Sequence, residues 1–219
     1  MDVWDWGKAL DSIPVILRGL VVTLQITVLG SLLAYVLGLV FAIVRRASIP
    51  VVDQLLWAFI EFVRSTPLLI QVFVLFYLLP PVTGISLSPT VTGVIALGVH
   101  YACYTSEVYR AGIDAIPAGQ WEAATALSLP RTRVWTGVIL PQAIPRVLPA
   151  LGNYTISMFK EVPLLLAIGV LDIVNSAKEL GADDYRFVEP YTMAGLAFLL
   201  LSYPAALLVR KLERRVNRV

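Results

Sequence analysis

The sequence predicts an all-α integral membrane protein with five transmembrane helices. The chain has 219 residues, of which 58% are hydrophobic and 15% charged, and its mean hydropathy is +0.79. A soluble domain of this size would expose much of that apolar surface, so a lipid bilayer is the expected environment. Because no low-complexity segment or Ser/Gly-rich linker divides the chain, we expect residues 1–219 to form a single transmembrane domain.

The composition argues against several kinds of site. The single cysteine, Cys103, excludes a disulfide framework or a cysteine metal cluster within one chain, and the single histidine, His100, leaves no His-rich ligand set. The formal net charge of +2 is too small to indicate nucleic-acid binding. A nucleotide-binding P-loop needs a Gly-Lys-Ser/Thr ending, and none of the four lysines stands in that setting. We therefore expect no metal and no cofactor in this chain, and no enzyme activity.

Five segments are long and apolar enough, or nearly so, to cross a bilayer, which takes about 20 residues of helix. Prolines interrupt the second and fourth of these segments. Such breaks are tolerated where the backbone is buried in protein or lines a cavity, so they indicate a translocation pathway. The segments are 20–44, 68–79 with the apolar residues before it, 91–111, 143–170 and 191–209, and the prolines are Pro67, Pro145, Pro149 and Pro163.

The charges predict the orientation of these crossings. Five crossings place the two termini on opposite sides, and basic residues concentrate on the cytoplasmic side of membrane proteins. The expected cytoplasmic set is Arg45, Arg46, Arg64, Arg110, Arg131, Arg133, Arg146, Arg210, Lys211, Arg214, Arg215 and Arg218. The expected external set is Lys8, Arg18, Lys178 and Arg186, with the acidic residues Asp172, Glu179, Asp183, Asp184 and Glu189. The bias predicts an external N-terminus and a cytoplasmic C-terminus.

The longest inner connection, residues 114–142, has an unusual pattern for a linker. Pro117 is placed to open a helix, residues 120–127 are rich in alanine, and Pro130 is placed to end it. A short helix with small side chains outside the bilayer suits docking against another protein. The alternative is an amphipathic helix that rests on the membrane surface.

A motif within this connection resembles the EAA loop of bacterial ABC importer permeases. The residues that carry the resemblance are Glu122, Ala123 and Ala124, followed by Ile139, Leu140 and Pro141. Ser128 replaces the glycine of the family pattern, and Leu140 follows Ile139 directly. Three longer stretches resemble the subfamily that takes up polar amino acids such as histidine, glutamine, arginine and opines: GIDAIPAGQWEAATALSLPRTRVW, VRSTPLLIQVFVLFYLLP and LGNYTISMFKEVPLLLAIGV.

The resemblance implies a type I ABC importer permease in the bacterial inner membrane. Its expected partners are a second permease subunit, either the same chain or a related one, a cytosolic ATPase dimer that binds ATP and Mg²⁺, and an external solute-binding protein. The expected substrate is a polar amino acid or a related zwitterionic solute such as ectoine. The residues expected to couple transport to the ATPase are Glu122, Ala123, Ala124, Ser128 and Pro141.

Polar residues within the predicted spans are candidates for a substrate pathway. In the third span His100, Tyr104 and Glu107 share one helical face, and in the fourth Asn153, Ser157 and Lys160 do the same. Ionisable groups at membrane depth are costly and mark pathways or ion pairs. The expected pathway residues are Gln71, Tyr104, Glu107, Asn153, Ser157, Lys160 and Glu161, with the lysine for a substrate carboxylate and a glutamate for an amino group.

Several alternatives stay open at the level of sequence. Lys160 could instead form an internal ion pair with Glu107 or Glu161 or snorkel to the membrane surface, and Gln71 could support broken backbone. For His100, a hydrogen bond between helices is the expected role. A secondary transporter driven by H⁺ or Na⁺ is the second class of function, although such proteins often have two repeated halves and this chain shows no self-similarity. A structural membrane protein is the third class.

Overall fold

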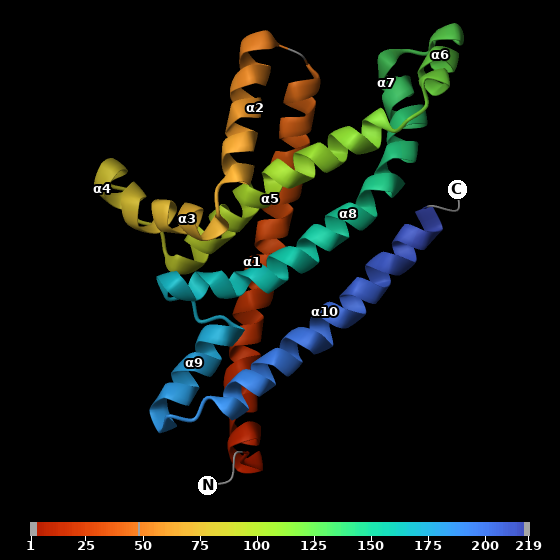
Figure 1. Cartoon of the computed structure of the whole chain (residues 1–219). Coiled ribbons are helices and arrows are strands. Elements are labelled where there is room, and N and C mark those ends of the chain that lie inside the picture. Colours follow the sequence, from red (N-terminus) through yellow and green to blue (C-terminus); the bar gives the residue numbers. More distant parts are fainter. Residues whose placement is uncertain (1–3, 48, 217–219) are drawn as a thin grey trace.

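The computed structural model describes residues 4–47 and 49–216, so Arg218 lies outside the described residues. Within them the chain forms helices and connecting turns and contains no strand (Figure 1). In chain order the helices are α1 (Trp6–Arg46), α2 (Pro50–Ser65), α3 (Leu68–Phe73), η1 (Val74–Leu78), α4 (Leu79–Thr83), α5 (Pro89–Asp114), α6 (Ala118–Ala126), α7 (Arg131–Val134), η2 (Trp135–Ile139), α8 (Leu140–Glu161), η3 (Val162–Ile168), α9 (Ile173–Asp184) and α10 (Val188–Val216).

Helix α1 is the longest element and the axis of the molecule. Its 41 residues extend for about 60 Å at 1.5 Å per residue. Asp5 caps its start by accepting hydrogen bonds from the backbone N–H groups of Gly7 and Lys8. Small residues let α5 approach closely: a Cβ added to Gly38 would lie 2.9 Å from the carbonyl oxygen of Ala102. The packed pair of α1 and α5 therefore forms the centre of the fold.

Three helical stretches among the described residues are long and apolar enough to cross a membrane: Trp6–Arg46, Arg131–Ile168 and Val188–Val216. A fourth is added if α2 and the segment Leu68–Thr83, which are bent by 108° at a short break, count as one span. Helix α5 is absent from this group because it carries many small and polar residues. Thr92, Thr105 and Ser106 on α5 are fully buried against the rest of the bundle rather than turned toward lipid.

The predicted irregularity of the second and fourth spans is confirmed in part. The sharp bend lies at Thr66 and Pro67, as the proline indicates, and Pro163 lies in the first turn of the 3₁₀ helix η3. The expectation that Pro145 and Pro149 interrupt the fourth span is wrong, because both lie inside the continuous helix α8. A proline removes one backbone donor and bends a helix, and in a membrane protein the neighbouring helices can compensate for this loss.

Two π-helical turns, η1 and η2, were not predicted from the sequence. In η1 the Leu79 N–H donates to the Val74 carbonyl, and in η2 the Leu140 N–H donates to the Trp135 carbonyl. Each turn ends two residues before a proline, Pro80 or Pro141, which has no N–H to donate. Such a bulge shifts the hydrogen-bond register, so each helix continues through its proline.

The two ends of the molecule differ. Helix α9 and the start of α1 lie at one end, while α6, α7 and the C-terminal part of α1 lie toward the other (Figure 1). Between them, the main apolar core joins α1, α3, α5, α8 and η3 around buried residues such as Ile26, Leu97 and Met158. Helix α10 leaves most of its apolar side chains, including Leu200 and Leu208, exposed, as suits a lipid-facing helix.

Candidate functional site

Three of the predicted pathway residues line one small hollow between α5 and α8. Its volume is about 210 Å³, and its lining comprises His100, Tyr101 and Tyr104 from α5 with Tyr154, Ser157 and Glu161 from α8. Two tyrosine pairs cross the hollow, Tyr101 with Tyr154 at 5.7 Å and Tyr104 with Tyr154 at 5.8 Å between ring centroids. Aromatic faces of this kind attract cations and pack against aliphatic stems.

Glu161 is the one acidic residue in the lining of this hollow. It is the last residue of α8, where the α-helix changes to the 3₁₀ helix η3, and its Oε2 atom is buried without a hydrogen-bond partner. A buried polar atom in this state costs about 1–3 kcal/mol, and more if it is charged. The C-terminal end of a helix also disfavours negative charge. Tyr101 of α5 interacts with the Glu161 carboxylate, so the group is satisfied in part within the chain, and Oε2 is left for a further donor.

Gln71 holds the break between α2 and α3 together. Its Nε2 donates to the carbonyl oxygens of Val63 (2.7 Å) and Thr66 (3.1 Å), and its Oε1 lies 3.1 Å from His100 Nδ1. The hydrogen bond between helices expected for His100 is therefore confirmed. Of the two roles considered for Gln71, contact with a solute or support of broken backbone, its amide fills the second. Gln71 does not line the hollow, but it contacts His100, which does.

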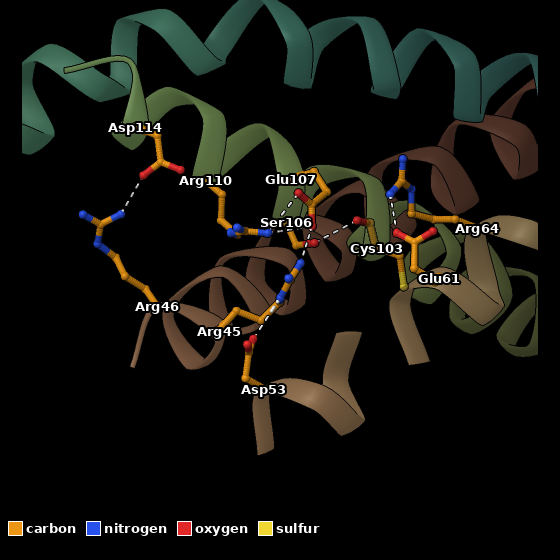
Figure 2. A network of polar contacts seen from close by, with 10 residues as sticks. All are labelled: Arg45, Arg46, Asp53, Glu61, Arg64, Cys103, Ser106, Glu107, Arg110 and Asp114. Atoms are coloured by element: carbon orange, nitrogen blue, oxygen red, sulfur yellow. Dashed lines mark hydrogen bonds and ion pairs between the residues drawn. The ribbon is translucent and has the colours of Figure 1, made fainter. Parts of the chain in front are cut away.

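Glu107 lies in a cluster of ion pairs rather than in the lining of the hollow (Figure 2). Its Oε1 is 2.6 Å from Arg45 Nη1 and its Oε2 is 3.1 Å from Arg110 Nη1. Arg45 is only 12% exposed and also contacts Asp53 of α2, with 3.2 Å between Nε and Oδ1. The cluster joins α1, α2 and α5 and contains equal numbers of positive and negative groups. These contacts favour a structural role for Glu107.

Asn153, Ser157 and Lys160 share an exposed face of α8, as the sequence predicts. Among the described residues, Lys160 forms no ion pair with Glu107 or Glu161, so the internal pair that the sequence left open is not present. Ser157 also contributes to the hollow. Lys160 is exposed and precedes Glu161 in the chain, but it is not one of the residues that line the hollow.

Arg64 is a residue beside this site that sequence reasoning missed. Its guanidinium lies over the Tyr104 ring, 5.2 Å from the ring centroid, and its Nη1 is 2.9 Å from Glu61 Oε1. The Tyr104 hydroxyl donates to the Arg64 carbonyl at 3.4 Å, and Arg64 Nε is buried without a partner. The sequence does place Arg64 three residues before the break at Pro67, which could have indicated a role beside the pathway. Its charge instead led to its placement in the expected cytoplasmic set.

The predicted docking helix is α6, and it begins directly after Pro117. Glu122 and Ala123 are exposed, whereas Ala124 is 2% exposed and packs within the chain. Ser128 adopts the left-handed conformation, with φ of 50°, despite having a side chain there. The Leu129 N–H donates to the Ala124 carbonyl at 3.1 Å, which closes the helix end. The backbone therefore makes a left-handed turn at Ser128, the position at which the motif pattern has glycine.

The motif ends against a second aromatic group. Trp121 of α6 and Trp135 of η2 contact edge to face, with ring centroids 5.4 Å apart. Pro141 is exposed in the first turn of α8, directly after η2. A hollow of about 510 Å³ lies beside these elements, and it is lined by Trp121, Thr125, Ser128, Leu129, Arg131, Val134 and Trp135. Helix α6, which carries Glu122, Ala123 and Ala124, lies at the opposite end of the molecule from α9 (Figure 1).

Comparison with known proteins identifies the family. The model of the binding-protein-dependent transport system inner membrane component matches residues 34–218. The chain belongs to this family. It is 45% identical to the probable amino-acid ABC transporter permease protein y4tG of Sinorhizobium fredii, covering 94% of this chain and 91% of that protein. It is 32% identical to the arginine transport system permease protein ArtQ of Bacillus subtilis, covering 97% of each chain.

The fold agrees with that assignment. A crystal structure of an amino acid ABC transporter with histidines superposes with a TM-score of 0.90 at 32% identity, covering 97% of this chain and 99% of the other. The chain is a multi-pass inner-membrane permease subunit of an ABC importer and not itself an enzyme. Such a subunit works with an ATPase and a solute-binding protein. Membership of this family also excludes the secondary transporter and the purely structural membrane protein.

Proposed function

We propose that this chain forms the pathway of an importer for polar amino acids, in which Glu161 receives the amino group of the solute. The observation that carries the proposal is the unpartnered Oε2 of Glu161 in a hollow with aromatic walls. A protonated amino group is the donor that suits an ionised carboxylate. Amino-acid transport by relatives of similar length supports the same class of substrate. A zwitterion such as ectoine carries the same two kinds of charge.

The other end of the solute is assigned by the same reasoning. Lys160 follows Ser157 on the exposed face of α8 and precedes Glu161, so its ammonium group is the proposed partner of the solute carboxylate. Asn153 lies on the same face and Tyr104 in the wall of the hollow, and we assign both to the pathway. Gln71 supports the wall through His100. Glu107 is assigned to the ion-pair cluster instead.

The proposed arrangement in the membrane has five crossings, with α5 as a crossing shielded from lipid. The N-terminus and α9 lie outside, and α6 and the C-terminus lie in the cytoplasm. The separation of α9 from α6 supports this orientation, as does the large excess of arginine near α6 and the C-terminus (Figure 1). Residues 1–219 form one domain, and a second permease subunit, the same chain or a related one, completes the pathway.

Coupling to ATP hydrolysis is proposed to run through α6. The exposed Glu122 and Ala123 dock on the cytosolic ATPase dimer, which binds ATP and Mg²⁺. The buried Ala124 and the exposed Ser128 and Pro141 set the shape of the loop. Glu122→Lys reverses the charge at this contact and should detach the ATPase while leaving the membrane helices inserted. Recovery of the ATPase with the purified variant, in amounts equal to those recovered with the parent chain, would contradict the assignment.

The function is tested by transport in proteoliposomes. The chain, its ATPase and its binding protein are reconstituted, and uptake of labelled L-arginine, L-glutamine, L-histidine and ectoine is measured with and without internal ATP. The proposal expects ATP-dependent uptake of at least one amino acid, lost in Glu161→Gln. Uptake of no zwitterion, or full uptake by that variant, would contradict it.

A further inference from the structure

Arg46, the last residue of α1, lies against the loop that carries the EAA motif. Its guanidinium is over the Trp121 ring at 5.5 Å and over the Trp135 ring at 5.4 Å from the ring centroids. Its Nη1 is 2.9 Å from Asp114 Oδ1 at the end of α5 (Figure 2). One side chain thus joins the end of α1 to α6, η2 and α5.

The geometry depends on the shape of a guanidinium group. Arginine is planar, so its faces can stack on rings while its N–H edge meets a carboxylate, and the compact ammonium of lysine cannot do both. The adjacent Arg45 makes no such contact, because its guanidinium is held by Glu107 and Asp53. Neighbouring arginines at the end of one helix therefore have different tasks: Arg45 ties the bundle together, and Arg46 reaches the loop.

Apart from Arg46, helix α6 is fixed to the bundle through Trp121, which packs against the buried cluster of Ile116, Ile139 and Ala143. Ala124 is the one residue of α6 that is buried, and Gln120 of α6 accepts a hydrogen bond of 3.2 Å from Gln142 Nε2 at an exposed position. Exposed contacts of this kind contribute little to stability. The contact of Arg46 with the edge-to-face pair of Trp121 and Trp135 adds to this packing a direct link between the end of α1 and α6.

Helix α1 is anchored at its other end to α9. The Ile173 N–H donates to Thr23 Oγ1 at 3.2 Å, and α9 approaches so closely that a Cβ on Gly19 would lie 2.7 Å from the Asp172 carbonyl oxygen. A continuous helix is stiff along its axis, so α1 is a rigid link between the region that contacts α9 and Arg46. The same 41-residue element therefore contacts both ends of the molecule.

We propose that Arg46 is a positioning residue that locks α6 to α1, so that α6 moves with α1 when the transporter changes state. Its part in coupling rests on the proposed function of α6 as the docking helix. Without the lock, the ATPase would still find Glu122 and Ala123, but events at α9 would no longer change the position of the docking helix. Arg46 acts through Trp121 and Trp135 and contacts neither solute nor nucleotide.

The test compares Arg46→Gln with Arg46→Lys and with the control Arg210→Gln, which removes an exposed arginine of α10. Hydrogen exchange of the α6 amides is measured in the assembled transporter, together with the stimulation of ATP hydrolysis by loaded binding protein. In Arg46→Gln we expect about tenfold faster exchange in α6, from the loss of two ring contacts and one ion pair. We expect a smaller increase in Arg46→Lys and no change in the control.

The same variants should lose the stimulation by loaded binding protein in the same order while still retaining the ATPase on purification. Unchanged exchange in α6 of both variants would overturn the lock. Faster exchange with full stimulation would overturn its part in coupling. If Arg46→Gln does not accumulate, Arg46→Lys decides the matter alone. Failure of the parent transporter to hydrolyse ATP in response to its binding protein would instead contradict the proposed function of α6, while the exchange measurement would still decide the lock.

Discussion

Glu107 and Glu161 have similar positions in the sequence pattern and opposite surroundings in the fold. Each lies on a predicted span beside other polar residues. Both carboxylate oxygens of Glu107 lie within 3.1 Å of an arginine nitrogen, whereas Oε2 of Glu161 is buried without a partner and faces a hollow with aromatic walls. Both oxygens of Glu107 are used to hold helices together, whereas Glu161 interacts with Tyr101 and keeps one oxygen without a partner. The two glutamates thus differ in their partners and not in their place in the sequence pattern, and the proposed division into a structural and a transport residue rests on that difference.

The largest expected effect is that of Glu161→Gln. The amide keeps the shape of the side chain and removes the charge, so a solute amino group loses a charge-assisted hydrogen bond of about 1.5–3 kcal/mol. Uptake at subsaturating solute should fall about 10- to 100-fold. The melting temperature of the purified subunit should stay the same or rise, because a charge with an unpartnered oxygen is gone. A large fall in melting temperature would mean that Glu161 is a structural residue like Glu107.

Lys160→Met should have the next largest effect. Lys160 is exposed, so its contact with a solute carboxylate is worth about 1 kcal/mol and its loss should lower uptake roughly five- to tenfold. Because Lys160 is not paired with either glutamate, the unfolding temperature should not change. Uptake and thermal denaturation of the same preparations check this prediction. If Lys160→Met destabilises the protein and the additional change Glu161→Gln reverses that loss, Lys160 and Glu161 form an internal ion pair and the prediction is wrong.

Glu107→Gln should reverse the pattern. It leaves Arg45, which is 12% exposed, with Asp53 as its remaining acidic partner. The loss should cost about 1–2 kcal/mol of stability. This is below the roughly 3–5 kcal/mol for breaking a fully buried pair, because Glu107 is 35% exposed. Uptake per folded molecule should change less than threefold. Denaturant unfolding and transport, both normalised to folded protein, measure the two quantities. Loss of transport without loss of stability would place Glu107 in the pathway after all.

Ser128→Gly should have the smallest effect and serves as a reference remote from both glutamates. The left-handed conformation at Ser128 costs a residue with a side chain about 1–2 kcal/mol, and glycine removes this cost. The greater backbone freedom of glycine in the unfolded chain offsets part of the gain. A net gain of about 0.5–1 kcal/mol is expected, with uptake unchanged. Calorimetry of the two proteins compares them directly, and a destabilised variant would mean that the Ser128 side chain makes a contact that outweighs its strain.

Local chemistry made part of the fold predictable. Pro67 has no backbone donor, and the chain bends next to it; Pro117 precedes α6 as expected of a residue before a helix. The expected break at Pro145 and Pro149 did not form because a helix packed among others can continue through a proline. The π-helical turns also escaped prediction, since a shift in hydrogen-bond register leaves no periodic signal.

The candidate site was predictable as a set of residues but not as a set of partners. Ser157 and Glu161 lie one turn apart on α8, so helical periodicity places both on the side that meets Tyr104 of α5 at the hollow. Glu107 pairs with Arg45, which is 62 residues away in the chain. No periodicity of a helix relates two residues so far apart, so this pair could not be predicted from the sequence. The contacts of Arg64 with Tyr104 and of Arg46 with two tryptophans are of the same kind. Long-range contacts of charged side chains need the fold.

The central claim is tested most directly by equilibrium binding of a labelled amino acid to the purified complex of permease and ATPase, without the binding protein, for the parent chain, Glu161→Gln and Glu107→Gln. L-Arginine, L-glutamine and L-histidine serve as probes. The account predicts that Kd rises about 10- to 100-fold in Glu161→Gln and stays within about threefold of the parent value in Glu107→Gln at a temperature where both are folded. Equal loss of affinity in the two variants, or loss in Glu107→Gln alone, would contradict it.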